Sequence, residues 1–220
     1  SKTNADGSFD LNSNGFPQIT SSPIVLGDPN PDWRGGISLN MRYKKFRLNA
    51  VLEHSHGGEF SPRTLWVLRR FGTTQETANR LTLDQSLVNY KGSTIPAGTT
   101  VRGNVEDFGA GPVLLDENWY RTGIGGGFGD NQAYNFSIAD ATWTKLRDLS
   151  LSYVLDTPVV KNIGLSDVIL TFTGRDLINI NNVDGIDPEI NTKGVSVAQG
   201  VEYFTNPQTK GFLFSLTINY

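Results

Sequence analysis

The chain has 220 residues, a formal net charge of −3, 10% aromatic residues, 24 glycines and no cysteine. The near-neutral charge, without a cluster of Lys and Arg, argues against nucleic-acid binding. The lack of cysteine excludes a disulfide scaffold, a thiolate metal site and a cysteine nucleophile. No apolar run is long enough for a transmembrane helix, but the short alternating strands of membrane barrels escape such a test. Glycine content and sparse helical patterns favour an all-β fold.

Residues 1–35 have turn chemistry throughout, including NADG, NSNG and GDPNPDW, and predict a loop region. They contain neither a basic nor an apolar leader segment, so no signal peptide is predicted, and their abrupt start indicates a chain cut from something longer. Residues 36–43 and 46–53 then alternate apolar and polar side chains across the two residues Lys44 and Lys45. Two period-2 runs joined by two residues predict a β-hairpin.

A long irregular region follows, at about residues 55–141, with one predicted helix from Pro62 to Arg70. Alternation returns at 143–155, where Lys145 and Arg147 interrupt the apolar face, and again at 168–175. A second long loop, about residues 177–209, precedes a final strand at 211–220. The five predicted strands are thus joined by connections that are short, long, short and long in turn.

This asymmetry is typical of outer-membrane barrels, which have short periplasmic turns and long extracellular loops. With Tyr220 at the periplasmic end, parity places both short turns there and both long loops outside, together with the loop region 1–35. Aromatic side chains beside the short turns then lie at one level, as a periplasmic girdle does. The predicted girdle consists of Tyr43, Phe46, Tyr153 and Tyr220. Trp143, which heads a strand, is expected in an outer girdle.

The polar sides of the same strands are expected to face the hydrated lumen. The predicted lumen-facing residues are Arg42, Arg47, Glu53, Asp148 and Arg175. The final strand carries an apolar stripe that ends on an aromatic residue and resembles the C-terminal signature used in outer-membrane assembly. The residues of this assembly signal are Phe212, Phe214, Leu216, Ile218 and Tyr220.

Four separated segments resemble the C-terminal part of the SusC/RagA family of TonB-dependent outer-membrane transporters, in the family's order. They are GDPNPDWRGGISLNMRYKKFRLNAVLEHSHGGE (27–59), ATWTKLRDLSLSYVL (141–155), LTFTGRDLINI with GIDPE (170–189) and YFTNPQTKGFLFSLTINY (203–220). The resemblance implies that residues 36–220 form the C-terminal portion of an antiparallel transmembrane barrel of about 22 strands with a plugged lumen.

The resemblance also implies partners. These are the rest of the same transporter, including its plug, a SusD-like surface lipoprotein over the extracellular face, and TonB, which would act through N-terminal segments absent from this sequence. The implied cargo is an oligomeric nutrient, a glycan or a peptide, and the implied location is the bacterial outer membrane. The long loops are then expected to contact either the lipoprotein lid or the ligand.

Candidate metal ligands are few. Glu53, His54, His56 and Glu59 lie close in sequence, but the chain has only two histidines and zinc usually takes three or four protein ligands. Asp184, Asp187 and Glu189 are weak candidates for a structural Ca²⁺ site because their spacing departs from an EF-hand, and turn chemistry is the favoured interpretation. Asp28 and Asp32 are judged in the same way. No cofactor is otherwise predicted.

Other motifs carry little chemistry. The stretch GIGGGFG at 123–129 lacks the strand, helix and Lys-Ser/Thr of a phosphate-binding loop, and the sequence contains no nucleophile elbow. No enzyme activity is therefore predicted. Trp66 and Trp119 are candidates for stacking on a substrate, with packing inside the loop as the alternative.

The sequence thus predicts the C-terminal barrel segment of an outer-membrane nutrient importer. The alternatives are a soluble, secreted β-sandwich that binds carbohydrate and a surface adhesin. Either would explain the alternation of polar and apolar residues, but neither explains the one-sided loops and the common level of the tyrosines.

Overall fold

The computed structural model describes residues 3–123, 134–192 and 199–220. The chain divides into two compact units. We call the first the loop unit; it comprises Ser1–Gly27, Phe60–Ala139 and Asn191–Phe204. We call the second the strand unit; it comprises Asp28–Glu59, Asp140–Ile190 and Thr205–Tyr220. The stretch GIGGGFG lies outside the described residues except for Gly123.

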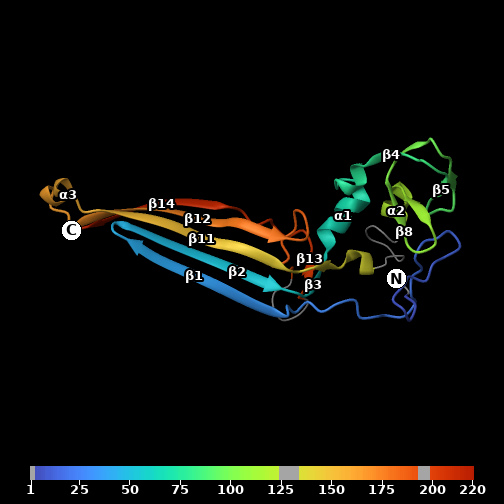
Figure 1. The fold of residues 1–220 in the computed structure, drawn as a ribbon, viewed down its shortest axis with the longest axis horizontal. Helices are drawn as coiled ribbons and strands as arrows, with labels where there is room; N and C mark the ends of the chain where they lie inside the picture. The colour runs from blue at the N-terminus through green and yellow to red at the C-terminus, as the bar shows by residue number, and fades with distance from the viewer. Residues whose placement is uncertain (1–2, 124–133, 193–198) are drawn as a thin grey trace. The chain divides into compact units, whose positions relative to one another are not determined.

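The strand unit is one five-stranded antiparallel sheet in the order β1-β2-β11-β12-β14 (Figure 1). Its strands are β1 (Trp33–Tyr43), β2 (Phe46–His56), β11 (Trp143–Leu155), β12 (Asp167–Asn181) and β14 (Gly211–Asn219). All five strands expected from the alternation are present. Several are longer than predicted: β1 begins at Trp33 rather than at residue 36, and β12 continues to Asn181.

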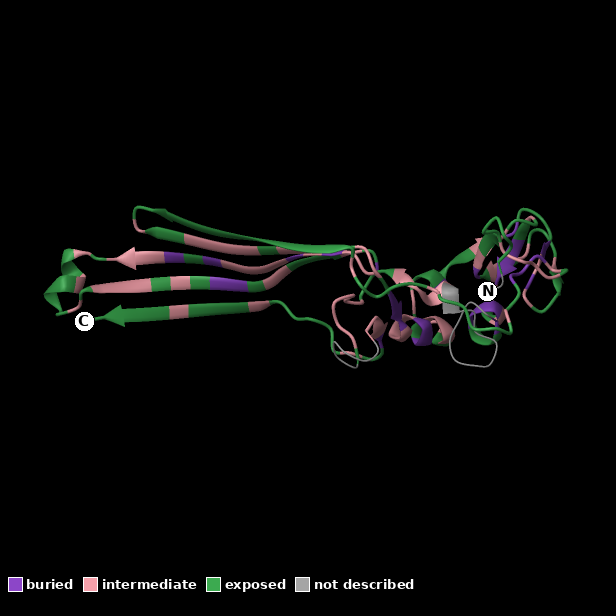
Figure 2. Ribbon diagram, turned by 90° about the horizontal axis from the view of Figure 1, so that it is seen from below, coloured by how far each residue is buried: buried purple, intermediate pink, exposed green. Residues whose placement is uncertain are grey.

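The register places apolar side chains on one face of the sheet and polar ones on the other, because residues paired across antiparallel strands share a face. One cross-strand row on the apolar face is Met41, Leu48, Leu151, Phe172 and Phe214. The next row, on the polar face, is Arg42, Arg47, Ser152, Thr171 and Ser215. In Figure 2, β1 is exposed along its whole length.

A β-bulge at Arg147 changes the phase of β11. Leu146 pairs with Leu52 and Asp148 with Val51, so Arg147 has no opposite residue on β2. An extra residue of this kind reverses which face the following side chains occupy. Lys145 therefore shares the polar face with Asp148, and the expectation that Lys145 and Arg147 interrupt the apolar face is wrong.

Both short connections lie at the same end of the sheet as the C-terminus (Figure 1). Lys44 and Lys45 join β1 to β2, with Lys44 in the left-handed region at φ 53°. The connection from β11 to β12 contains one short helix, α3 (Pro158–Asn162), with proline in its first turn, where the missing N–H costs nothing. An ion pair between Lys45 and Asp156 links the two connections.

The loop unit is more structured than its sequence suggests. Its helix α1 (Arg63–Phe71) matches the predicted helix and ends on Gly72 in the left-handed conformation that glycine favours. The strand β3 (Glu59–Pro62) pairs in parallel with β13 (Val201–Glu202). The remaining elements are η1 (Glu76–Ala78), β4 (Arg80–Thr82), β5 (Leu87–Val88), β6 (Thr94–Ile95), β7 (Thr100–Arg102), β8 (Asn104–Asp107), β9 (Pro112–Leu115), α2 (Glu117–Thr122), η2 (Tyr134–Ser137) and β10 (Ala139–Asp140).

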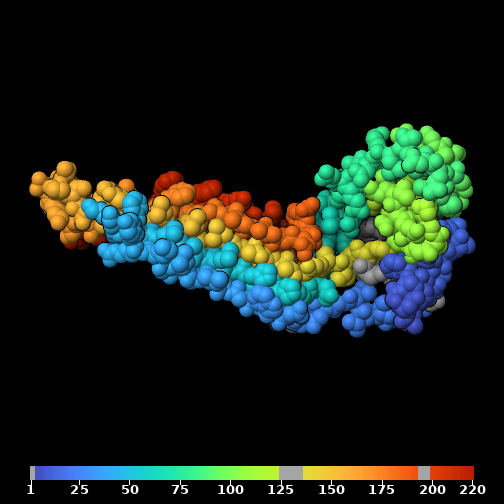
Figure 3. Space-filling view, in the orientation of Figure 1, coloured from blue at the N-terminus to red at the C-terminus, as the bar shows by residue number. Residues whose placement is uncertain are grey.

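Two small hydrophobic cores hold the loop unit together. The first joins Phe16 from the N-terminal segment to Val113, Leu115, Trp119 and Tyr120; the second consists of Leu83, Leu87 and Leu114. Figure 3 shows the N-terminal residues, in dark blue, against the green surface of this unit. Among the described residues, no helix is both long and apolar enough to cross a membrane.

Candidate functional site

The apolar face of the strand unit is exposed over all five strands. On the outer strands Met41 is 55% exposed and Phe214 80%, and on the central strand Leu151 is 47% exposed. Exposed apolar patches larger than a few hundred Å² are rare in soluble monomers and mark contact with a partner or a membrane. Continuous exposure across five paired strands defines a sheet with one face suited to an apolar environment.

The predicted girdle residues gather at the short-turn end of this face. Tyr43 pairs with Phe46, and Phe46 pairs with Tyr153 with their ring centroids 4.7 Å apart. Tyr220 follows the last residue of β14 and is 99% exposed. The structure thus brings three of the four aromatic side chains into one cluster at this end, whereas Tyr220 follows the edge strand β14, which β12 separates from β11.

A different aromatic group lies at the opposite end of the apolar face. The ring of Trp33 is centred 4.9 Å from that of His54 and 5.8 Å from that of His56, and His54 Nδ1 is hydrogen-bonded to the Thr144 hydroxyl at 2.8 Å. Trp143 pairs with Ser55 on the polar face and is buried. The expectation of Trp143 in an outer girdle is therefore wrong, because the bulge sets its phase, and Trp33 occupies that level instead.

Hydroxyl groups line the centre of the polar face. Ser150 and Thr173 are hydrogen-bonded at 2.9 Å, and Ser152 and Thr171 at 2.8 Å. The five residues predicted to face the lumen all lie on this face: Arg42 opposite Arg47, Asp148 opposite Arg175, and Glu53 opposite Lys145. The register brings them to one face; their contact with a lumen stays a prediction.

A buried ammonium group organises the long-loop end of the polar face. Lys145 is 1% exposed, and its Nζ donates to both carboxylate oxygens of Asp187 at 2.8 and 2.7 Å, to Glu189 Oε2 at 2.6 Å and to Gln208 Oε1 at 3.0 Å. It also lies 5.0 Å above the ring of Trp143. A buried charge persists only when paired and hydrogen-bonded, as this one is.

Arg147, the bulge residue, extends the network. Its Nε donates to Glu53 Oε2 at 2.7 Å, a second nitrogen donates to Glu189, and a third lies 3.7 Å from Asp176. Burial acts to raise the pKa of the Glu189 carboxyl, but hydrogen bonds from Arg147 and Lys145 outweigh it and hold that pKa below its ordinary value. The network ties the loop after β12 to the face of β11.

Two of the three weak calcium candidates, Asp187 and Glu189, take part in this network instead. Asp187 and Glu189 are bound by Lys145, which occupies the position where a cation would compete for their oxygens. Within residues 3–123, 134–192 and 199–220, no group of three or more His, Asp or Glu side chains is arranged to hold a metal ion. Glu59, weighed with the histidines, accepts the backbone N–H of Asp28 at 2.7 Å.

The two tryptophans considered for substrate stacking are packed inside the loop unit. Trp66 is 4% and Trp119 3% exposed. Trp119 lies among Phe16, Tyr90 and Phe108, with ring centroids 5.5–5.7 Å away. Packing within the loop, which was the alternative, accounts for both side chains.

The sequence reasoning missed Lys145 and Arg147 as functional residues. A signal was present, because the charged residues Lys145 and Arg147 occupy odd positions, whereas the polar residues from Asp148 to Ser152 occupy even positions. Such a change of phase within one strand indicates a bulge.

The sheet topology, the exposed apolar face and the aromatic end define a segment of a transmembrane β-barrel. Comparison with known proteins agrees. The chain is 24% identical over 216 residues to TonB-dependent receptor P3 of Formosa agariphila, which covers 96% of this chain and 18% of that protein. No family model matches the chain.

Solved structures give the same fold. The chain resembles the RagAB peptide importer in its open-open state with a TM-score of 0.55 at 15% identity, over 97% of this chain and 20% of the importer chain. For the closed-closed state the TM-score is 0.53 at 16% identity, over 100% and 20%. The chain spans about a fifth of the length of these relatives. The chain is thus similar to a barrel segment of a TonB-dependent receptor, in agreement with the resemblance to the SusC/RagA family seen in its sequence.

Proposed function

We propose that this chain forms part of the wall of an outer-membrane active transporter that imports an oligomeric nutrient. The observation that carries the proposal is the division of the five-stranded sheet into an exposed apolar face and a polar, hydrogen-bonded face. Lipid would cover the first and the hydrated lumen or plug would meet the second, as alternation in membrane barrels requires. The named relatives, a receptor and an importer, support transport rather than catalysis.

The proposal includes a partner and an energy source. A SusD-like lipoprotein would cover the extracellular side, by analogy with the two-component RagAB importer. TonB would act on segments of the transporter other than this chain. The cargo would be a glycan or a peptide. The loop unit, with its own cores, would supply the surface that meets the lid or the cargo.

Neighbouring positions on β14 provide the test. Phe214 lies on the apolar face and Ser215 on the polar face. An arginine facing lipid near the bilayer centre costs about 2–4 kcal/mol. Phe214→Arg should therefore sharply lower the amount of folded, heat-modifiable protein in the outer membrane, while Ser215→Arg should lower it far less.

The same pair of variants tests the soluble sandwich and adhesin alternatives. In water, Phe214→Arg would remove an exposed aromatic side chain and leave folding unaffected or improved. If both variants partition into the aqueous phase and fold without detergent, the proposed function is refuted.

A further inference from the structure

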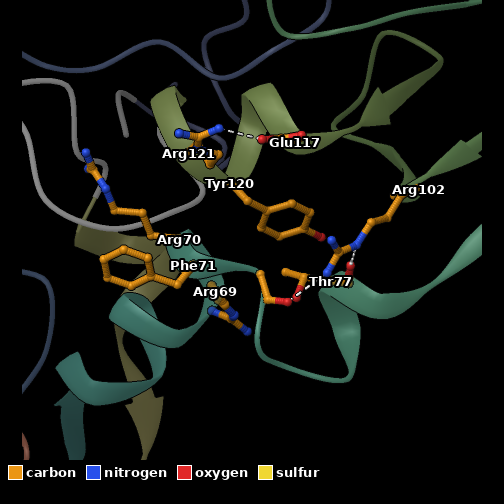
Figure 4. Close-up of a pocket in the computed structure, with 10 residues that line it drawn as sticks. Arg69, Arg70, Phe71, Thr77, Arg102, Glu117, Tyr120 and Arg121 are labelled. Carbon is orange, nitrogen blue, oxygen red and sulfur yellow. Dashed lines mark hydrogen bonds and ion pairs between the residues drawn. The ribbon is translucent and has the colours of Figure 1, made fainter.

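A cleft with a positive lining opens in the loop unit between the end of α1 and α2 (Figure 4). Four arginines, Arg69, Arg70, Arg102 and Arg121, line it beside a single carboxylate, Glu117. A hollow of ≈ 100 Å³ continues into a second of ≈ 420 Å³ that shares Arg70, Glu117 and Arg121. Because the whole chain has a net charge of −3, this concentration of guanidinium groups is a local feature.

Arg102 is held in place by carbonyl groups, which carry no net charge. Arg102 donates from Nε to the carbonyl oxygen of Thr77 at 2.5 Å and from Nη2 to that of Gly72 at 2.7 Å. These carbonyl groups orient the guanidinium but leave its charge in the cleft. Arg121 forms an exposed i,i+4 ion pair with Glu117 at 2.6 Å, and such pairs are weak enough to rearrange around a ligand.

A tyrosine and a phenylalanine complete the lining. The Tyr120 hydroxyl donates to Glu76 Oε1 at 3.1 Å, and Glu76 is also paired with Arg69 at 2.8 Å. Burial and the neighbouring Glu76 carboxylate raise the pKa of Tyr120, so the phenol adds no negative charge. Phe71 lies across the cleft from Tyr120 in Figure 4 and is 73% exposed, which offers an apolar ring face at the rim.

This chemistry selects an anionic ligand rich in hydrogen-bond acceptors. The planar fork of arginine matches a carboxylate with two parallel hydrogen bonds. A peptide would also bring backbone N–H donors, whereas the one carboxylate in the lining, Glu117, is already paired with Arg121. A sugar ring can satisfy the same donors through its oxygens and pack its C–H face on an aromatic ring.

We propose that this cleft binds carboxylate groups of an acidic oligosaccharide. This proposal names a ligand class for the proposed function. It rests on the proposed function only in assuming that the bound ligand is then imported. Binding itself depends on the loop unit alone.

The test measures binding of a galacturonate oligomer of about five units to the intact, detergent-solubilised protein by calorimetry. The matched ligand is the same oligomer with its carboxylates methyl-esterified. We expect the acid to bind, the ester to bind at least about tenfold more weakly, and the affinity for the acid to fall as salt is added.

Two variants place the binding in the cleft. The double variant Arg70→Gln, Arg121→Gln should weaken binding of the acid by at least about tenfold. If the double variant misfolds, Arg121→Gln alone, at an exposed position, should still weaken binding of the acid. Lys91→Gln removes the same charge from an exposed position outside the cleft lining and should leave binding unchanged.

The proposal is overturned if the acid does not bind, if the ester binds equally well, or if the cleft variants bind like the unaltered protein. An oligoglutamate peptide of equal charge that binds as tightly as the uronate would overturn the assignment to an oligosaccharide. None of these outcomes bears on the partition of the Phe214 and Ser215 variants, so failure of the cleft and failure of the transporter proposal are distinguishable.

Discussion

Replacing Lys145 with methionine should be among the most damaging single changes in the strand unit. Methionine keeps the unbranched stem but removes the ammonium group, which donates to Asp187, Glu189 and Gln208. The Asp187 side chain is only 6% exposed, so its carboxylate would be left buried without its partner. Removal of one member of a buried pair costs about 3–5 kcal/mol, which shifts the folding equilibrium by roughly two to four orders of magnitude.

Urea titration of the protein in detergent micelles, followed by tryptophan fluorescence, measures this loss. Amide hydrogen exchange reports it locally, since Glu189 N–H is bonded to Asp187 Oδ1 at 3.0 Å and Ile190 N–H to the Asp187 carbonyl at 3.2 Å. Both amides should lose protection in Lys145→Met. Exchange also separates loss of the loop from loss of the whole sheet.

Lys45→Met is the matched control, because it removes an equally charged side chain from an exposed ion pair with Asp156. We expect no measurable change there, since exposed pairs contribute little. If Lys145→Met loses less than about 1 kcal/mol and the two amides stay protected, the network does not anchor the loop, and the reasoning from burial is wrong.

Three further results are expected. The pKa of Glu189 is lowered in the folded state, so its contribution to stability is complete at neutral pH and is lost as the pH falls through the folded pKa. In Glu189→Gln, the protection of amides at residues 183–190 against hydrogen exchange should therefore decrease less as the pH falls through this range. Deletion of Tyr220 should reduce the heat-modifiable fraction in the outer membrane, and unchanged assembly would contradict the role of the terminal aromatic. Trp119→Ala should destabilise the loop unit by about 3–5 kcal/mol, seen as faster proteolysis within residues 60–123, whereas a solvent-facing substrate platform would tolerate the change.

The strand unit was largely predictable because its signal is local. In each strand, side chains two residues apart lie on the same face and have similar polarity, as Met41 and Tyr43 do. The bulge at Arg147 was missed because a strict period of two was applied through it. The error affects only the part of β11 before the bulge, where Trp143 and Lys145 lie on the opposite face from the one predicted.

The loop unit was not predictable in the same way. Its first core joins Phe16 to Trp119, which are far apart in sequence and belong to no shared period. The cleft likewise depends on Arg102 reaching carbonyl groups at Gly72 and Thr77. Contacts between irregular segments leave no repeating pattern in one sequence, so these features required coordinates.

The loop unit is assembled from three separated stretches of chain, yet its hydrophobic cores contain no residue of the five long strands. The five long strands, in turn, form their ladder hydrogen bonds with one another, with β1 and β14 at the two edges of the sheet. Substitutions and insertions can therefore accumulate in one unit without disturbing the hydrogen-bond register of the other. Under the proposed function, such a division would allow related proteins to bind different ligands with their loop units while they keep the same barrel strands.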